Sequence, residues 1–211
     1  MPIDYAKARR VLARRDPILG GLIRRYGACG LGSNQHTNPF QALVRAIISQ
    51  QLSTKAAATI AGRFEDLFEG GFPTPGQVIA TSDARLRAVG LSGQKLSYLR
   101  DLCERIEAGS LPLHSLDAMD DELVIETLTA VKGIGRWTAE MFLMFRLQRP
   151  DVLPVGDLGI VKAVQRAYRL RKIPTPDRLV RIGESWRPYR SIACWYLWAS
   201  LDNAPLQKNE T

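Results

Sequence analysis

The sequence predicts an all-α fold, and three observations support that prediction. Nearly every segment has a helical pattern, whereas alternating runs of β-branched residues are missing. Three segments begin with a polar capping residue followed by proline, at Asn38-Pro39, Thr74-Pro75 and Thr175-Pro176. Proline suits the first turn of a helix because it lacks the N–H group that would be unpaired there. The 211 residues, 45% of them hydrophobic, are enough to bury a substantial core.

Ten helices are expected in order, at residues 4–26, 39–51, 54–68, 75–80, 83–89, 93–108, 121–131, 137–147, 158–170 and 177–201. Besides the three proline-marked starts, Ser53, Ser82 and Ser92 have the position of N-caps. Gly90 and Gly109 have the position of helix ends.

Two later helices carry further local signals. Asp120, Asp121 and Glu122 place three acids at the positive end of the seventh helix, which the helix dipole favours. The last helix is expected to break at Pro188.

Composition excludes several classes of protein. The longest apolar run, Ser191 to Leu201, is too short to span a bilayer, and the N-terminus lacks the apolar core of a signal peptide. We therefore expect an intracellular protein with no membrane partner, cytoplasmic or nucleoid-associated in a bacterium and nuclear in a eukaryote. Cys29, Cys103 and Cys194 are too widely spaced for a disulfide framework or a zinc site. No cofactor is expected.

The net charge of +8 is concentrated at the two ends of the chain. Residues 1–25 hold seven basic and two acidic residues, and residues 162–190 hold nine basic and two acidic residues. The segment between them has a net negative charge. If the ends pack together, they form a basic lobe suited to nucleic acid, although charge alone also fits two solvated helices.

The segment LTAVKGIGRWTAEMFLMFRLQRPDVLPVGD, residues 128–157, joins a glycine-containing turn between two helices to a single aspartate. The turn around Gly133 and Gly135 exposes N–H groups at the start of a helix, which suits a phosphate. Asp157 is placed where the next helix begins. Each piece alone also fits a local role, Gly133 as a helix end and Asp157 as a cap.

The motifs GIGRWTA and PVGD resemble those of the helix-hairpin-helix DNA glycosylases, the HhH-GPD superfamily, over roughly Asn38 to Leu201. Within it the chain most resembles the DNA-3-methyladenine glycosylase II branch. The resemblance implies a two-lobed all-α fold with an active-site cleft between the lobes. It implies a central lobe of about 53–150, a second lobe from 1–52 plus 151–211, and a helix-hairpin-helix of about 121–147.

The resemblance also implies how such a protein holds damaged double-stranded DNA. Hairpin N–H groups would contact phosphate, with Lys132, Gly133, Gly135, Arg136 and Thr138 as the DNA-binding residues there. A sodium or potassium ion would be bound by the backbone carbonyls of Thr129, Val131 and Ile134. The gap left by the extruded nucleotide would be filled from the segment Gln50, Gln51, Leu52 and Ser53, with Gln51 as first choice and Leu52 as second; a plain interhelical turn is the alternative.

Asp157 is the expected catalytic residue. Its carboxylate would stabilise the cationic sugar formed as the base leaves, and would orient or deprotonate the attacking water. Relatives that also cleave the backbone carry a Schiff-base lysine where this chain has Trp137, so the resemblance implies a monofunctional enzyme. Trp137 and Trp198 are the expected substrate-binding residues, because an aromatic face attracts a cationic alkylated purine. Trp186 and Trp195 are expected to pack in the core.

The function implied is removal of 3-methyladenine- or 7-methylguanine-type bases by a cofactor-free monomer. One alternative is a glycosylase of the same fold for deaminated, mismatched or oxidised bases. Another is a DNA-binding module that senses damage without catalysis. An enzyme is expected to expose Asp157 beside aromatic faces, whereas a binder could bury it in a helix cap.

Overall fold

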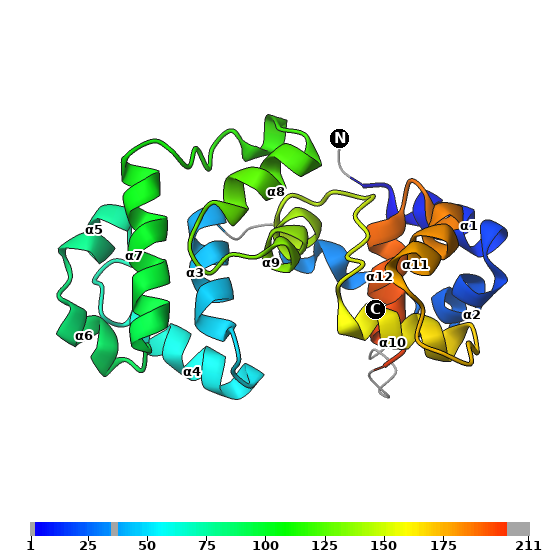
Figure 1. Ribbon diagram of the computed structural model, residues 1–211, viewed down its shortest axis with the longest axis horizontal. Helices are drawn as coiled ribbons and strands as arrows, with labels where there is room; N and C mark the ends of the chain where they lie inside the picture. The colour runs from blue at the N-terminus through cyan, green and yellow to red at the C-terminus, as the bar shows by residue number, and fades with distance from the viewer. Residues whose placement is uncertain (1–2, 35–37, 202–211) are drawn as a thin grey trace. The chain divides into compact units, whose positions relative to one another are not determined.

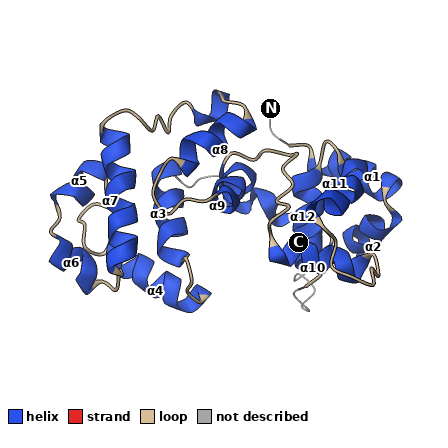
Figure 2. Ribbon diagram, in the orientation of Figure 1, coloured by secondary structure: helices blue, strands red, loops and turns tan. Residues whose placement is uncertain are grey.

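The structure is a computed structural model that describes residues 3–34 and 38–201. Over those two ranges it contains twelve α-helices, a few short 3-10 or π-helical turns and no strand (Figure 1; Figure 2). The prediction of an all-α fold is therefore confirmed. In the same part of the chain, no helix combines the length and the apolarity that crossing a membrane requires.

The chain divides into two compact units, which we call the central unit (residues 38–142) and the terminal unit (residues 3–34 and 143–201). These limits differ from the expected lobe boundaries near 53 and 150. The helix α3 (Pro39–Ser49) joins the central unit because it packs on two helices of that unit. The segment that follows Phe142 joins the terminal unit because the Gln148 side chain bonds Tyr5 and the Leu31 carbonyl.

The central unit contains α3, α4 (Thr54–Glu65), α5 (Pro75–Ala80), α6 (Asp83–Ala88), α7 (Gly93–Glu107), the 3-10 turn η2 (Leu116–Ala118), α8 (Asp121–Thr129) and α9 (Arg136–Met141). Its longest helix is α7, which contacts α3, α5 and α6 (Figure 1). The core side chains of α7 are apolar residues at helical spacing, namely Leu96, Leu99 and Leu102. The pair α8 and α9 forms the hairpin.

The terminal unit contains α1 (Tyr5–Arg15), α2 (Pro17–Tyr26), the 3-10 turn η1 (Gly30–Asn34), the π-helical turn η3 (Phe142–Arg146) that continues from α9, α10 (Leu158–Ala167), α11 (Pro176–Gly183), the 3-10 turn η4 (Glu184–Trp186) and α12 (Arg190–Ala199). The nearly apolar helix α12 is its centre and contacts α1, α2 and α10. Its buried residues are Ser191, Ile192, Ala193, Cys194, Tyr196 and Leu197, so the helix is buried on nearly all sides.

The prediction of one helix over residues 4–26 is wrong, because the chain breaks at Asp16-Pro17. The Asp16 carboxylate caps α2 by accepting the N–H groups of Ile18 and Leu19. The same carboxylate accepts the Trp186 Nε1–H at 3.0 Å. Trp186 is fully buried, which confirms that this tryptophan belongs to the core. The predicted break near Pro188 is confirmed, since α11 and α12 are separate helices.

Candidate functional site

The turn between α8 and α9 needs glycine at one of its two glycine positions. Gly133 has φ +80°, and a Cβ built there would lie 2.1 Å from Cδ2 of Tyr98. Gly135 has φ −92°, and a Cβ there would meet no atom within 4 Å. The fold therefore explains Gly133, whereas the open space beside Gly135 leaves room for a ligand to approach the backbone.

Several backbone N–H groups of this turn donate to no acceptor among the described residues, namely those of Gly133, Gly135 and Arg136. Their neighbours are satisfied. The Lys132 N–H donates to Oδ2 of Asp101 at 2.9 Å, and the Ile134 N–H donates to the Val131 carbonyl at 3.1 Å. Unsatisfied N–H groups at a helix start are suited to an anion.

The side chains of the hairpin form ion pairs. Arg136 donates through both terminal nitrogens to the two carboxylate oxygens of Glu122, and its Nε lies 3.2 Å from Oε1 of the buried Glu140. The Lys132 Nζ lies 3.9 Å from Oδ1 of Asp101. Burial acts to raise the pKa of Asp101, but the Lys132 N–H and Arg105 outweigh it and hold that pKa below its usual value.

The three carbonyls expected to hold an alkali-metal ion lie at the end of α8 and in the turn after it. Thr129 is the last residue of α8, where carbonyls lack intrahelical donors. The Val131 carbonyl already accepts the Ile134 N–H but has a second lone pair. Neutral oxygens of this kind fit sodium or potassium, and the described residues contain no cluster of His, Cys, Asp or Glu that would fit another metal.

The segment Gln50–Ser53 links α3 to α4 and is tied to the hairpin turn within the central unit. The Gln50 Nε2 donates to the Gly133 carbonyl at 2.7 Å, so this side chain fixes the turn. Gln51 is exposed and has φ +58°, a left-handed conformation that is unusual for a residue other than glycine. Leu52 is also exposed, and Ser53 caps α4 through the Ala56 N–H. Strain of this kind is often found at functional loops.

In the terminal unit, Asp157 is the N-cap of α10. Its Oδ1 accepts the Ile160 N–H at 2.7 Å and the Trp198 Nε1–H at 2.9 Å. The residue is only 8% exposed, so the expectation of an exposed carboxylate is wrong. The physical reason is that cap and indole bonds both draw the carboxylate against the protein. It nevertheless lies beside an aromatic side chain, as expected of an enzyme.

Trp198 is supported on one side by another aromatic ring. Its ring is stacked on Phe145 with centroids 6.0 Å apart and an interplanar angle of 25°. Phe145 comes from η3, and π-helical turns are frequent at functional sites. A Cβ on Gly159 would lie 2.9 Å from Oδ1 of Asp157 and 3.1 Å from two atoms of the Trp198 indole. Glycine at 159 therefore leaves space for the pair formed by Asp157 and Trp198.

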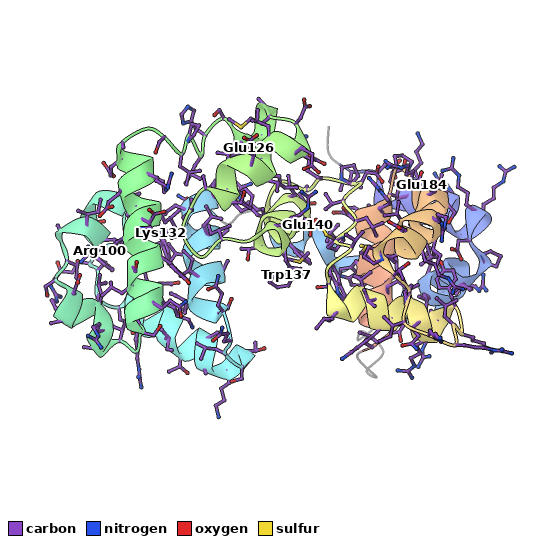
Figure 3. All side chains as sticks on the ribbon, viewed as in Figure 1. Arg100, Glu126, Lys132, Trp137, Glu140 and Glu184 are labelled. Atoms are coloured by element: carbon purple, nitrogen blue, oxygen red, sulfur yellow. The ribbon has the colours of Figure 1, made fainter. Side chains whose placement is uncertain are left out.

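The other expected site residues lie on α9 in the central unit. Trp137 projects from this helix and is 51% exposed, so it is not a core residue (Figure 3). Thr138 beside it is half-buried. On α12, Trp195 packs edge-on against Tyr196 but is only half-buried, so it does not belong to the fully buried core expected for it.

Several residues around these groups were not anticipated from the sequence: Tyr98, Asp101, Phe145 and Gly159. Tyr98 and Asp101 lie on α7, distant in sequence from the hairpin that they contact. The sequence signal for Gly159 is its position two residues after Asp157, because glycine is unusual in the first turn of a helix.

Comparison with known proteins places these features in a family. The family described as HhH-GPD superfamily base excision DNA repair protein matches residues 44–188. The DNA-3-methyladenine glycosylase 1 of Schizosaccharomyces pombe is 40% identical over 168 residues, 79% of this chain and 74% of that protein. The DNA-3-methyladenine glycosylase 2 of Escherichia coli is 31% identical over 192 residues, 86% of this chain and 65% of that protein.

Solved structures agree with the sequence comparison. The structure of the Schizosaccharomyces pombe 3-methyladenine DNA glycosylase in complex with abasic DNA has a TM-score of 0.82 at 36% identity, and the match covers 96% of this chain and 100% of that chain. The DNA-3-methyladenine glycosidase of Bacillus halodurans has a TM-score of 0.84 at 41% identity, with 93% of this chain and 89% of that chain covered.

Proposed function

Because the chain belongs to the HhH-GPD superfamily of base excision DNA repair proteins, we propose that it is a monofunctional DNA glycosylase of the DNA-3-methyladenine glycosylase II type. It would extrude a damaged nucleotide from double-stranded DNA and hydrolyse the N-glycosidic bond of an alkylated purine, leaving an abasic site. The relatives named above support this class of substrate through their names. We expect such an enzyme to be located with the chromosome, in the cytoplasm or nucleoid of a bacterium or in the nucleus of a eukaryote.

The observation that carries the proposal is the way in which Asp157 is held. Two donors fix the orientation of its carboxyl group, and its position at the start of α10 places it at the positive end of that helix. A carboxylate held in a fixed position can stabilise the positive charge that develops on the sugar without first reorganising. The same group can orient or deprotonate the water that attacks the sugar.

The proposal of a monofunctional enzyme rests on Trp137. A lysine at this position would supply the amine for a Schiff base with the sugar, whereas an indole cannot. Lys132 lies on the turn before α9, and its Nζ is near Asp101. We expect borohydride to trap no covalent complex with DNA, and a trapped complex would contradict the proposal.

Trp137 and Trp198 are proposed to favour cationic purines. An exposed indole on α9 offers an electron-rich face, on which 3-methyladenine or 7-methylguanine can stack as cations. Trp198 is proposed to act in part through Asp157, because its Nε1–H is committed to that carboxylate and Phe145 stacks on its ring.

The DNA would be held and opened by the central unit. The N–H groups of Gly133, Gly135 and Arg136 are proposed to bind phosphate, with Lys132 and Thr138 beside them. Gln51, or Leu52 next to it, is proposed to fill the gap in the duplex, while Gln50 positions the turn and Ser53 caps α4.

The protein is proposed to act as a monomer without a cofactor for its chemistry. A sodium or potassium ion at the carbonyls of Thr129, Val131 and Ile134 would supply positive charge next to the phosphate. The catalytic step assigned to Asp157 does not depend on that ion.

A damage-sensing module without catalysis is the second candidate, and the burial of Asp157 in a helix cap is the observation in its favour. The deciding experiment is base release from duplexes that each carry one lesion: 3-methyladenine, 7-methylguanine, uracil or 8-oxoguanine. Release of the methylated purines supports the proposal. Release of only uracil or 8-oxoguanine would show a different substrate class, and binding without release of any base would favour the sensor.

A further inference from the structure

The hairpin carries no net positive charge with which to attract DNA. Its two cations, Lys132 and Arg136, are both engaged in ion pairs, Lys132 with Asp101 and Arg136 with Glu122 and Glu140. What the hairpin offers to a phosphate is therefore a set of neutral N–H groups. Neutral donors release few counterions, so the salt-dependent part of DNA binding requires another surface.

The helix α10 presents such a surface. Its buried face consists of Ile160, Ala163 and Val164, and the helix packs on α12. The opposite face is exposed and carries Lys162 and Arg166, one helical turn apart. Neither side chain makes a hydrogen bond or ion pair with a described residue.

Arg169, the second residue after the end of α10, is likewise exposed, and its side chain has no such partner in the described ranges. Arg169 has φ +51°, the left-handed conformation that glycine normally provides after a helix. An arginine at this position costs backbone strain that glycine would avoid.

Lys162 and Arg166 lie on the helix that Asp157 caps. At 1.5 Å of rise per residue, Lys162 and Arg166 lie about 8 Å and about 14 Å along the axis from the capping residue. The first exposed side chain after Asp157 is Leu158, which is 72% exposed and uncharged. The exposed cations of α10 therefore begin one turn after Asp157, and Arg166 lies farther along the helix from it than Lys162 does.

We propose that Lys162, Arg166 and Arg169 form a cationic stripe that binds phosphate groups of the duplex backbone. This stripe supplies most of the salt-dependent part of DNA binding, whereas the hairpin binds through neutral amides. The inference rests on the proposed function only in taking DNA as the ligand, and it does not depend on catalysis.

The test measures the affinity for an undamaged duplex between about 50 and 200 mM salt, as the slope of log affinity against log salt. Replacement of all three stripe residues by glutamine should reduce that slope by roughly 2 to 3, because each phosphate contact contributes about 0.9. The matched control replaces Arg10, Arg14 and Arg24 by glutamine. These residues are exposed on α1 and α2 of the same unit, and the control changes the net charge equally.

The control should leave the slope within about 0.5 of wild type. An unchanged slope in the stripe variant, or an equal fall in both variants, would overturn the proposal. Base release plays no part in this measurement, so its failure and that of the proposed enzyme are distinguishable.

A single substitution separates the charge of Arg169 from its backbone strain. Arg169→Gly should melt at the same or a higher temperature, because glycine adopts positive φ freely. Its salt slope should nevertheless fall by about 1. A variant that keeps the wild-type slope would contradict the role of Arg169 in the stripe.

Discussion

The indole of Trp198 donates a hydrogen bond from Nε1 to Oδ1 of Asp157 at 2.9 Å. The same oxygen accepts the Ile160 N–H, so a cap from α10 and an indole from α12 act on one atom. The carboxyl group is thereby fixed by two helices that pack together in the terminal unit. A group fixed before the reaction begins loses no energy to reorganisation as charge develops on the substrate.

Trp198→Phe tests this hydrogen bond. Phenylalanine can still stack on Phe145 but has no N–H to donate. Without this donor the carboxylate is less firmly oriented toward the charge that develops on the sugar, so single-turnover base release should slow by roughly 10-fold or more. Affinity for undamaged duplex should stay within about twofold, since the DNA contacts remain.

The matched control is Trp195→Phe, which lies on the same helix and packs edge-on against Tyr196. It should release base at close to the wild-type rate. Equal slowing in both variants would indicate a general loss of packing in α12 and would contradict a specific role for the Trp198 N–H.

Gly159→Ala tests the space beside this pair. The added Cβ would lie 2.9 Å from Oδ1 of Asp157, so the carboxylate or the indole must move. Base release should fall by on the order of 10-fold, because catalytic groups are sensitive to displacements well below 1 Å. Gly156→Ala is the control, since a Cβ there meets no atom within 4 Å. Wild-type activity of Gly159→Ala would show that the pair tolerates displacement.

Local signals in the sequence were sufficient to predict most helix starts. Asn38, Thr74 and Thr175 each cap a helix whose first residue is proline. The same signal is present at Asp16-Pro17, so the prediction of one helix over residues 4–26 is an error of interpretation where two helices exist. That error could have been avoided from the sequence, because the capping carboxylate and the proline are adjacent.

The site itself could be predicted only in part. The glycine turn and Asp157 are local motifs, and the motif placed Asp157 at a helix start, where it lies. Its burial depends on Trp198 as well as on the cap, and the contact with Trp198 spans 41 residues of chain that no local pattern encodes. The same holds for Tyr98, since the close packing of its ring on Gly133 depends on how α7 meets the hairpin.

Substitution of Gly133 should lower both stability and DNA affinity, whereas substitution of Gly135 should lower DNA affinity alone. Gly133→Ala must adopt a positive φ and displace the Tyr98 ring, so the protein should lose about 1–3 kcal/mol of unfolding free energy as well as DNA affinity. Gly135→Ala has ordinary φ and open space, so its stability should be near that of wild type.

Gly135→Ala should nevertheless bind duplex less tightly, because a methyl group there obstructs the approach of a phosphate to the backbone. Thermal melting and duplex affinity, measured on both variants, check this pair of outcomes. Undiminished DNA affinity in Gly135→Ala would rule out close phosphate contact at this residue.

Gln51→Gly should separate stability from function in the segment between α3 and α4. Glycine relieves the positive φ of Gln51, so the melting temperature should stay equal or rise. Base release should fall by on the order of 10-fold, because glycine has no side chain to fill the gap in the duplex. If release is unchanged, the inserted residue is not Gln51, and Leu52→Ala is the next variant to measure.

Base release from methylated duplex DNA by wild type and Asp157→Asn, side by side, tests the central claim most directly. Asparagine keeps an oxygen that can cap α10 and accept the Trp198 N–H, so both hydrogen bonds to Oδ1 can be retained while the charge is removed. We expect wild type to release 3-methyladenine and 7-methylguanine, and Asp157→Asn to release them on the order of 100-fold more slowly or worse. Equal release by the two proteins would remove Asp157 from the mechanism and contradict its proposed catalytic role.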